Sequence, residues 1–202
     1  MYKKLEKFYV WGIKILIYLI PFLPLFIAKQ IVFPYVTGKS FAFRILVELA
    51  TVLWLGLIVL NKEYRPKNSV ILSAVLFFTF VVGLADIFGV NPYGSFWSSF
   101  ERMDGYITIL HLMAYFVIVT SVLITKKDWK IFLNIFVIAA VPVCMYALFQ
   151  RFGHEGIFRV FSTLGNPPFL AGYLILILFV GLVLLSSARS KFLKSFYCPQ
   201  CM

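Results

Sequence analysis

Six long apolar runs are the feature that most constrains what this chain can fold into. A helix needs about 20 apolar residues to cross the hydrocarbon core of a bilayer. The runs that reach this length are Phe8–Ala28, Phe41–Leu60, Val70–Phe88, Tyr106–Ile124, Trp129–Phe149 and Pro168–Leu185. Only 13% of the chain is charged, against about a quarter in a soluble domain. We therefore predict an all-α, polytopic transmembrane helical bundle of about six spans over residues 1–187, with a short cytoplasmic tail over residues 188–202.

The basic residues between these runs predict an orientation in the membrane, because cytoplasmic loops are enriched in Lys and Arg. One set of alternate loops carries Lys3, Lys4, Lys7, Lys62, Arg65, Lys67, Lys126, Lys127, Lys130, Arg189, Lys191 and Lys194. The other set carries only Lys29, Lys39, Arg102, Arg151 and Arg159. We expect both termini on the cytoplasmic side of the cytoplasmic membrane, with the loops 29–40, 89–105 and 151–167 facing outward among membrane lipid.

The net charge of +11 does not indicate a nucleic-acid partner. The basic residues form small groups between apolar runs, and no motif of a DNA- or RNA-binding module appears. No pair of His or acidic residues has metal-ligand spacing, so we expect no metal and no cofactor. Cys144 lies in an apolar run and is typical of an inert packing residue. Cys198 and Cys201 form half of a zinc-ribbon pattern, a redox pair, or a short tail left by truncation.

The outward loop NPYGSFWSSFERMDG, residues 91–105, concentrates turn residues and charges at the mouth of a membrane helix. Arg102 is suited to a phosphate because its planar guanidinium donates two parallel hydrogen bonds. The alternative is a solvated helix start before the fourth span, with Gly105 at its beginning and acids near the positive end of the helix dipole. The aromatic residues of this loop fit an interfacial belt, or else a surface on which a sugar stacks.

A second outward segment, FRVFSTLGNPPFLAGY over residues 158–173, brings Arg159 close to a turn at Gly165 and Asn166. The prolines that follow are typical of a first helical turn. The free N–H groups and positive dipole of a helix start attract an anion. The alternative is a helix start without a ligand.

Two polar positions lie within the spans. Arg44 and Glu48 are four residues apart on one helix face, which predicts an ion pair within the helix. Alternatively, Arg44 faces an anionic group held between helices. His111, one turn into the fourth span, is predicted to be packed or bonded to backbone, in preference to acting as a base.

Read together, SFWSSFERMDG and STLGNPPFLAGYL resemble two motifs of the O-antigen ligase and polymerase superfamily of bacterial membrane proteins. Ser98 stands where Gly is common in that family, and Pro168 stands where Asn is often found. The segment GKSFAFRILVELA around Arg44 is also similar to the group. The resemblance covers about residues 39–184 and implies the N-terminal half of a lipid-carrier glycosyltransferase.

The resemblance implies transfer of a glycan from an undecaprenyl-diphosphate carrier at the outer face of the cytoplasmic membrane. It assigns the carrier diphosphate to Arg102, Arg159, Gly165, Asn166 and Arg44. Family members are usually longer and carry their key Arg and His in a later outer loop, so we assign no catalytic residue. We expect the chain to be an N-terminal part, inactive without its C-terminal half or a partner subunit. The alternatives are a membrane transporter, as in bicarbonate-carrier annotations, and a non-catalytic partner subunit.

Overall fold

The protein is all-helical in the computed structural model, which describes residues 2–28, 30, 33–99, 104–153 and 159–187. Helix makes up 82% of the structure, and the described residues form no strand. The elements in chain order are α1 (Tyr2–Leu19), η1 (Ile20–Leu25), α2 (Thr37–Leu60), η2 (Lys62–Tyr64), α3 (Val70–Ile87), α4 (Pro92–Trp97), α5 (Tyr106–Val122), α6 (Lys126–Phe152), η3 (Ser162–Leu164) and α7 (Pro167–Ser186). The all-α prediction is therefore confirmed.

Local chemistry explains where the helices differ from the apolar runs. The α-helix of the first run ends at Leu19 and continues as the 3₁₀ segment η1, because Pro21 and Pro24 cannot donate backbone hydrogen bonds. The helix of the fifth run, α6, begins at Lys126, three residues before the apolar run starts at Trp129. There Thr125 and Asp128 form a capping box that satisfies N–H groups at the helix start. Hydrophobicity therefore located the helices, and caps and prolines set their ends.

Five helices are long and apolar enough to cross a membrane: Tyr2–Leu25, Thr37–Leu60, Val70–Ile87, Lys126–Phe152 and Pro167–Ser186. The fourth predicted span, Tyr106–Ile124, forms α5, an apolar helix of 17 residues. At 1.5 Å per residue it measures about 26 Å, slightly less than the hydrocarbon core of about 30 Å. The expectation of about six spans therefore holds for five helices by length, with α5 shorter.

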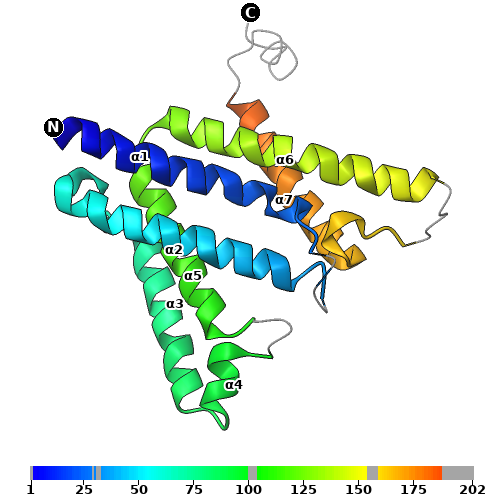
Figure 1. Cartoon of the computed structure of the whole chain (residues 1–202), viewed down its shortest axis with the longest axis horizontal. Coiled ribbons are helices and arrows are strands. Elements are labelled where there is room, and N and C mark those ends of the chain that lie inside the picture. Colours follow the sequence, from blue (N-terminus) through cyan, green and yellow to red (C-terminus); the bar gives the residue numbers. More distant parts are fainter. Residues whose placement is uncertain (1, 29, 31–32, 100–103, 154–158, 188–202) are drawn as a thin grey trace, which may run out of the picture.

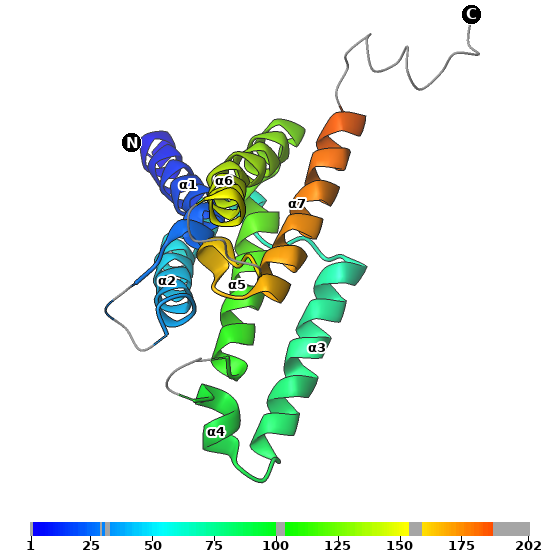
Figure 2. The ribbon, with the colours of Figure 1, turned by 90° about the vertical axis from the view of Figure 1, so that its right-hand side faces the viewer.

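The helices run in two directions (Figure 1). Helices α1, α2 and α6 lie along the long axis of the molecule, whereas α3 and α5 form an antiparallel pair that crosses it. The view turned by 90° shows α1, α2 and α6 nearly end-on and α3, α5 and α7 from the side (Figure 2). The six helices are therefore not one bundle of parallel spans, although the sequence predicted each of them to cross the membrane.

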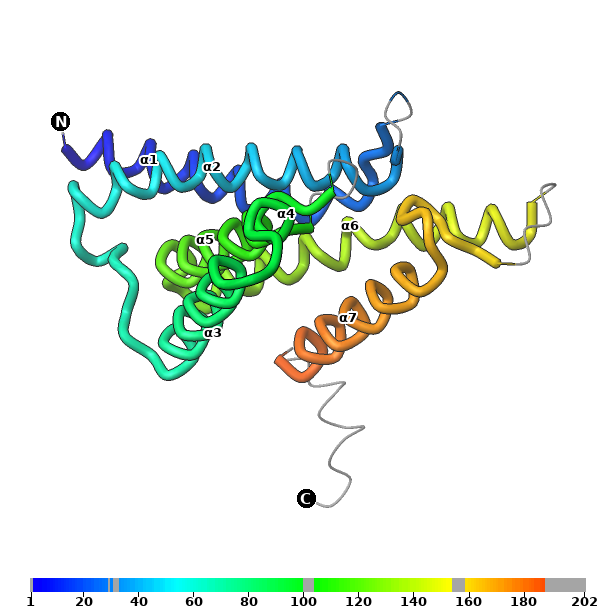
Figure 3. Tube along the Cα trace, turned by 90° about the horizontal axis from the view of Figure 1, so that it is seen from below, coloured from blue at the N-terminus to red at the C-terminus, as the bar shows by residue number. Residues whose placement is uncertain are grey.

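The core lies where the two sets of helices meet. Ile13 of α1, Leu57 of α2, Ile118 of α5 and Phe132 of α6 belong to one cluster of buried side chains. Helix α5 packs against α2 and α1, and Figure 3 shows these helices from below. Helices α3 and α7 contribute no residue to this cluster.

Polar contacts tie together the segments that the charge pattern placed on the cytoplasmic side. Lys14 of α1 forms an ion pair with Asp128 of α6 at 2.5 Å. Asn61, between α2 and η2, donates a hydrogen bond to Glu6 at 2.9 Å. The chain start, the α2–α3 connection and the start of α6 therefore meet in one region.

Candidate functional site

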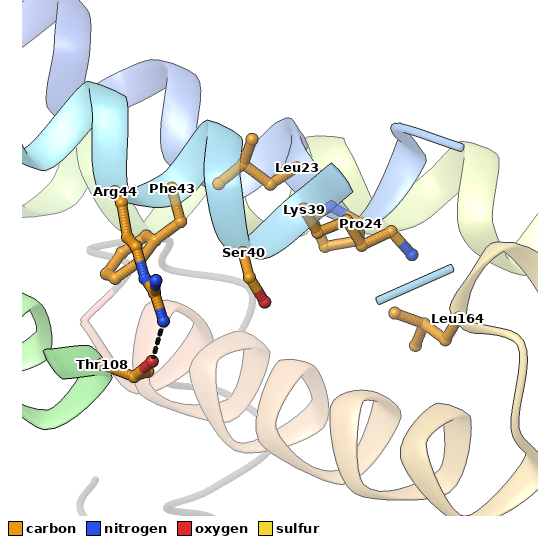
Figure 4. Close-up of a pocket in the computed structure, with 8 residues that line it drawn as sticks. All are labelled: Leu23, Pro24, Lys39, Ser40, Phe43, Arg44, Thr108 and Leu164. Atoms are coloured by element: carbon orange, nitrogen blue, oxygen red, sulfur yellow. Dashed lines mark hydrogen bonds between the residues drawn. The ribbon is translucent and has the colours of Figure 1, made fainter. Parts of the chain in front are cut away.

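A cationic pocket lies beside the first turns of α2 (Figure 4). It has a volume of about 260 Å³. The residues that line it are Leu23, Pro24, Lys39, Ser40, Phe43, Arg44, Thr108 and Leu164. We call it the Lys39–Arg44 pocket. Its lining contains two cationic side chains, two hydroxyl groups and no carboxylate, and this combination suits an anionic ligand.

Arg44 is held at this pocket by a contact between helices. Its side chain is buried, with 8% exposed, and its Nη2 donates a hydrogen bond to Thr108 Oγ1 of α5 at 2.6 Å. The negative charges of Asp104 and Glu48 also act on the guanidinium. Because a buried guanidinium needs partners, the bond to Thr108 holds Arg44 in position.

Glu48 pairs with His111 on α5, at 3.1 Å between Oε1 and Nε2. The spacing of Arg44 and Glu48 predicted an ion pair within α2, and the structure also gives each of them a contact to the neighbouring helix α5. His111 Nδ1 also lies 2.7 Å from the Ile107 carbonyl, so the prediction of a backbone-bonded histidine is confirmed.

Lys39 forms the second cationic wall and was missed as a site residue in the sequence, where it counted only as a loop charge. Its Nζ donates to the Thr163 carbonyl at 2.5 Å, which joins the start of α2 to η3. A lysine five residues before an arginine carries no motif signal. Only the packing of η3 against α2 places Lys39 at the pocket.

A second and larger pocket, of about 440 Å³, lies next to the first and shares Leu164 with it. Its lining consists of Phe33, Pro34, Tyr35, Val36, Asp104, Leu164, Gly165, Asn166 and Phe169. We call it the three-loop pocket, because the segments that contribute to it precede α2, α5 and α7. The charge pattern predicted all three to lie on the outward side.

The turn at Gly165 is shaped by close approach to Tyr35. Gly165 adopts φ +75°, the left-handed conformation that glycine adopts without strain. A Cβ at this position would lie 2.5 Å from the Tyr35 Cβ. The predicted turn at Gly165 and Asn166 is therefore present, and it forms part of the wall of the three-loop pocket.

Buried hydrogen bonds hold the chain before this turn against α6. Ser162 is fully buried. Its N–H donates to the Gln150 side chain at 2.8 Å, and its hydroxyl donates to the Val143 carbonyl at 2.7 Å. These bonds stabilise a positive φ of 49° at Ser162. The backbone that leads to Gly165 is therefore fixed before α7 begins.

The start of α7 has fewer free N–H groups for binding an anion than its sequence suggested. Asn166 is the residue before the helix, and Pro167 and Pro168 occupy the first two helical positions. Neither proline has an N–H group, and the Leu170 N–H already bonds to the Asn166 carbonyl. Of the first-turn donors, only the Phe169 N–H is left for a ligand. The cations on α2 therefore contribute more to anion binding than this helix start.

The sequence-predicted residues divide into three groups. Arg44, Gly165 and Asn166 line two adjacent pockets. Arg159 is exposed and lines neither of them. Arg102 lies outside the described residues.

Comparisons of this chain with protein-family models, with curated proteins and with solved structures find no match.

Proposed function

We propose that this chain is part of a membrane glycosyltransferase of the O-antigen ligase and polymerase type, acting on undecaprenyl-diphosphate-linked glycans at the outer face of the cytoplasmic membrane. The observation that carries the proposal is the placing of Lys39 and Arg44 in one pocket, next to the Gly165–Asn166 turn. The two sequence motifs supply Asp104 and Leu164–Asn166 to the adjoining three-loop pocket. Segments that are far apart in the sequence, and that resemble the family's motifs, thus surround one polar region.

In this proposal the Lys39–Arg44 pocket binds the diphosphate of the carrier. A diphosphate carries several negative charges, and hydrogen bonds from charged donors are about twice as strong as neutral ones. Ser40 and Thr108 add hydroxyl groups beside the two cations. When the bond to the carrier breaks, negative charge increases on the leaving diphosphate. Fixed cations stabilise that charge more than they stabilise the ground state, and this difference is the requirement for catalysis.

The three-loop pocket would hold the sugar next to the diphosphate. It combines the rings of Phe33, Tyr35 and Phe169 with the polar groups of Asp104 and Asn166. Pockets for polar ligands commonly pair aromatic walls with a few hydrogen-bonding groups that set orientation. The Asp104 carboxylate accepts hydrogen bonds from sugar hydroxyls and repels a phosphate. The cationic pocket would therefore bind the charged diphosphate, and the three-loop pocket would bind the uncharged sugar.

The reaction forms a bond between an acceptor hydroxyl oxygen and the anomeric carbon and breaks the bond from that carbon to the diphosphate oxygen. The acceptor proton must pass to a base, and we assign that role to no residue of this chain. The part that Lys39 and Arg44 play is binding the diphosphate and neutralising its charge.

Binding of undecaprenyl diphosphate to the full chain in lipid nanodiscs tests the proposal. A hydrogen bond to a charged group contributes about 1.5–3 kcal/mol, so Arg44→Gln and Lys39→Gln should each weaken binding by about 10- to 100-fold. Arg44→Lys keeps the charge but loses the forked geometry, so its effect should be smaller.

Lys67→Gln, an exposed lysine remote from both pockets, is the matched control and should bind as the parent does. Circular dichroism verifies that the helix content of each variant is unchanged. Failure of the parent chain to bind undecaprenyl diphosphate would overturn the proposal, as would equal binding by all variants. Bicarbonate flux into vesicles, without lipid-diphosphate binding, would identify a transporter instead.

A further inference from the structure

A groove between α6 and α7 lies outside the two pockets described above. It has a volume of about 420 Å³, within the range of about 300–1,000 Å³ that is usual for ligand pockets. Its lining exposes no polar surface and includes Leu133 and Phe136 of α6 with Tyr173 and Val180 of α7. In Figure 2, α7 runs beside α6 on the side of the molecule that faces away from α1. We call this the α6–α7 groove.

One end of the α6–α7 groove opens into a basic pocket. This pocket, of about 400 Å³, shares Leu133 and Val183 with the groove and adds Lys126, Trp129 and Lys130. The three added residues lie on one face of α6, because positions three and four apart are neighbours on a helix. An apolar groove therefore continues into a mouth with two ammonium groups and an indole.

The charge of this mouth is not cancelled by the nearest acid. Asp128 is two residues from each lysine, and it forms its ion pair with Lys14 of α1. No carboxylate lines the basic pocket or the groove among the residues that the structure describes. The mouth therefore has two positive charges for one negatively charged group.

We propose that the α6–α7 groove binds an anionic phospholipid, with an acyl chain in the groove and the phosphate between Lys126 and Lys130. Basic pockets between membrane helices bind anionic headgroups, and Trp is enriched at the level of the headgroups. From Tyr173 to Val183 is ten residues of α7, or about 15 Å at 1.5 Å per residue. This is half of a hydrocarbon core of about 30 Å, the depth of one leaflet.

This lipid differs in place and role from the substrate of the proposed glycosyl transfer. Lys126 and Lys130 belong to the basic set that the charge pattern assigns to the cytoplasmic side, whereas Lys39 belongs to the other set. The bound lipid would fill the space between α6 and α7, whose one buried residue is Leu170. It would thereby stabilise the packing of α7 without taking part in the reaction.

Electron spin resonance on the full chain in phosphatidylcholine vesicles tests the proposal, with trace spin-labelled phosphatidylglycerol or phosphatidylcholine as the probe. The parent chain should immobilise phosphatidylglycerol in preference to phosphatidylcholine. A lysine near the membrane surface contributes about fivefold to binding of an anionic lipid. Lys126→Gln and Lys130→Gln should each lower the preference by about that factor, and the double variant should lower it further.

Lys62→Gln/Lys67→Gln removes two exposed lysines outside the groove and is the matched control, which should keep the preference. An equal loss in the control would show general surface attraction and overturn the proposal. Val180→Trp fills the groove and should reduce immobilisation of both lipids. If instead it lowers self-association, measured by energy transfer between labelled copies, and leaves the lipid preference unchanged, the groove is a protein interface and the proposal fails.

Discussion

Gly165 shows how much the site depends on the backbone of a single residue. Its left-handed φ of +75° turns the chain from η3 into α7, and it lies directly against Tyr35. Tyr35 also packs edge-to-face on Phe161, with ring centroids 5.9 Å apart. The sequence predicted the turn, because Gly-Asn-Pro is a turn signal. It did not predict that Tyr35, far away in the chain, removes the space for a side chain.

We predict that Gly165→Ala destabilises the protein by about 1–3 kcal/mol. About 1–2 kcal/mol comes from forcing a Cβ into the left-handed region, and the overlap with Tyr35 adds to this. Denaturant unfolding in detergent micelles, followed by circular dichroism, measures the change.

Gly172→Ala is the matched control, because a Cβ there meets nothing within 4 Å. Alanine favours helix over glycine by about 1 kcal/mol, so the control should be neutral or slightly stabilising. Equal effects of the two substitutions would show that the turn at Gly165 is not under steric constraint.

At the scale of the elements, an ion pair between Lys14 and Asp128 joins α1 to α6. The sequence of neither helix alone predicts it. The side chains of Lys14 and Asp128 are only 18% and 15% exposed. Asp128 also accepts a hydrogen bond from the Thr125 hydroxyl at 2.8 Å within the capping box. Lys14 lies inside the first apolar run, and the structure gives it a partner because the start of α6 lies beside the middle of α1.

We predict that Lys14→Met destabilises the protein by about 1–3 kcal/mol, because it leaves the Asp128 charge partly buried without its partner. Asp128→Asn removes that charge and keeps a side-chain oxygen for the capping box. The double variant should therefore be less destabilised than the sum of the two single variants. A double-mutant cycle of unfolding free energies measures this coupling, and strict additivity would show that the pair contributes no net stability.

At the scale of the whole molecule, the helices run in two directions. The ability of a helix to span a membrane and its actual direction in the molecule are therefore separate properties. Transmembrane helices tilt by about 20° on average and rarely beyond about 40° from the bilayer normal. In Figure 1, α3 and α5 run across the direction of α1, α2 and α6, so the two sets of helices do not share one axis. Hydrophobicity gives each helix the ability to span. No residue of α3 or α7 belongs to the central cluster of buried side chains, so that cluster does not fix their direction.

Cysteine labelling in intact cells tests the orientation predicted by the charge pattern. In a background with Cys144, Cys198 and Cys201 replaced by Ser, we expect a membrane-impermeant maleimide to label Asn91→Cys and Asn166→Cys from outside. Lys67→Cys should react only after the membrane is permeabilised. All three positions are exposed in the structure.

Opposite labelling of Asn91→Cys and Asn166→Cys would show that the number of crossings between them is odd. The prediction of alternating spans would then be wrong between α3 and α7.

The sequence by itself determined the helical class, the approximate position of each long helix and the turn before α7. These depend on apolar run length, proline and glycine, which act through neighbouring residues and are therefore visible in one chain. Only the tertiary structure decided that Lys39 joins Arg44, that Glu48 pairs with His111, and that Arg159 stays outside both pockets. Such pairings join residues far apart in the sequence. They arise from the way helices with mostly apolar, interchangeable faces pack together, and local sequence does not encode that choice.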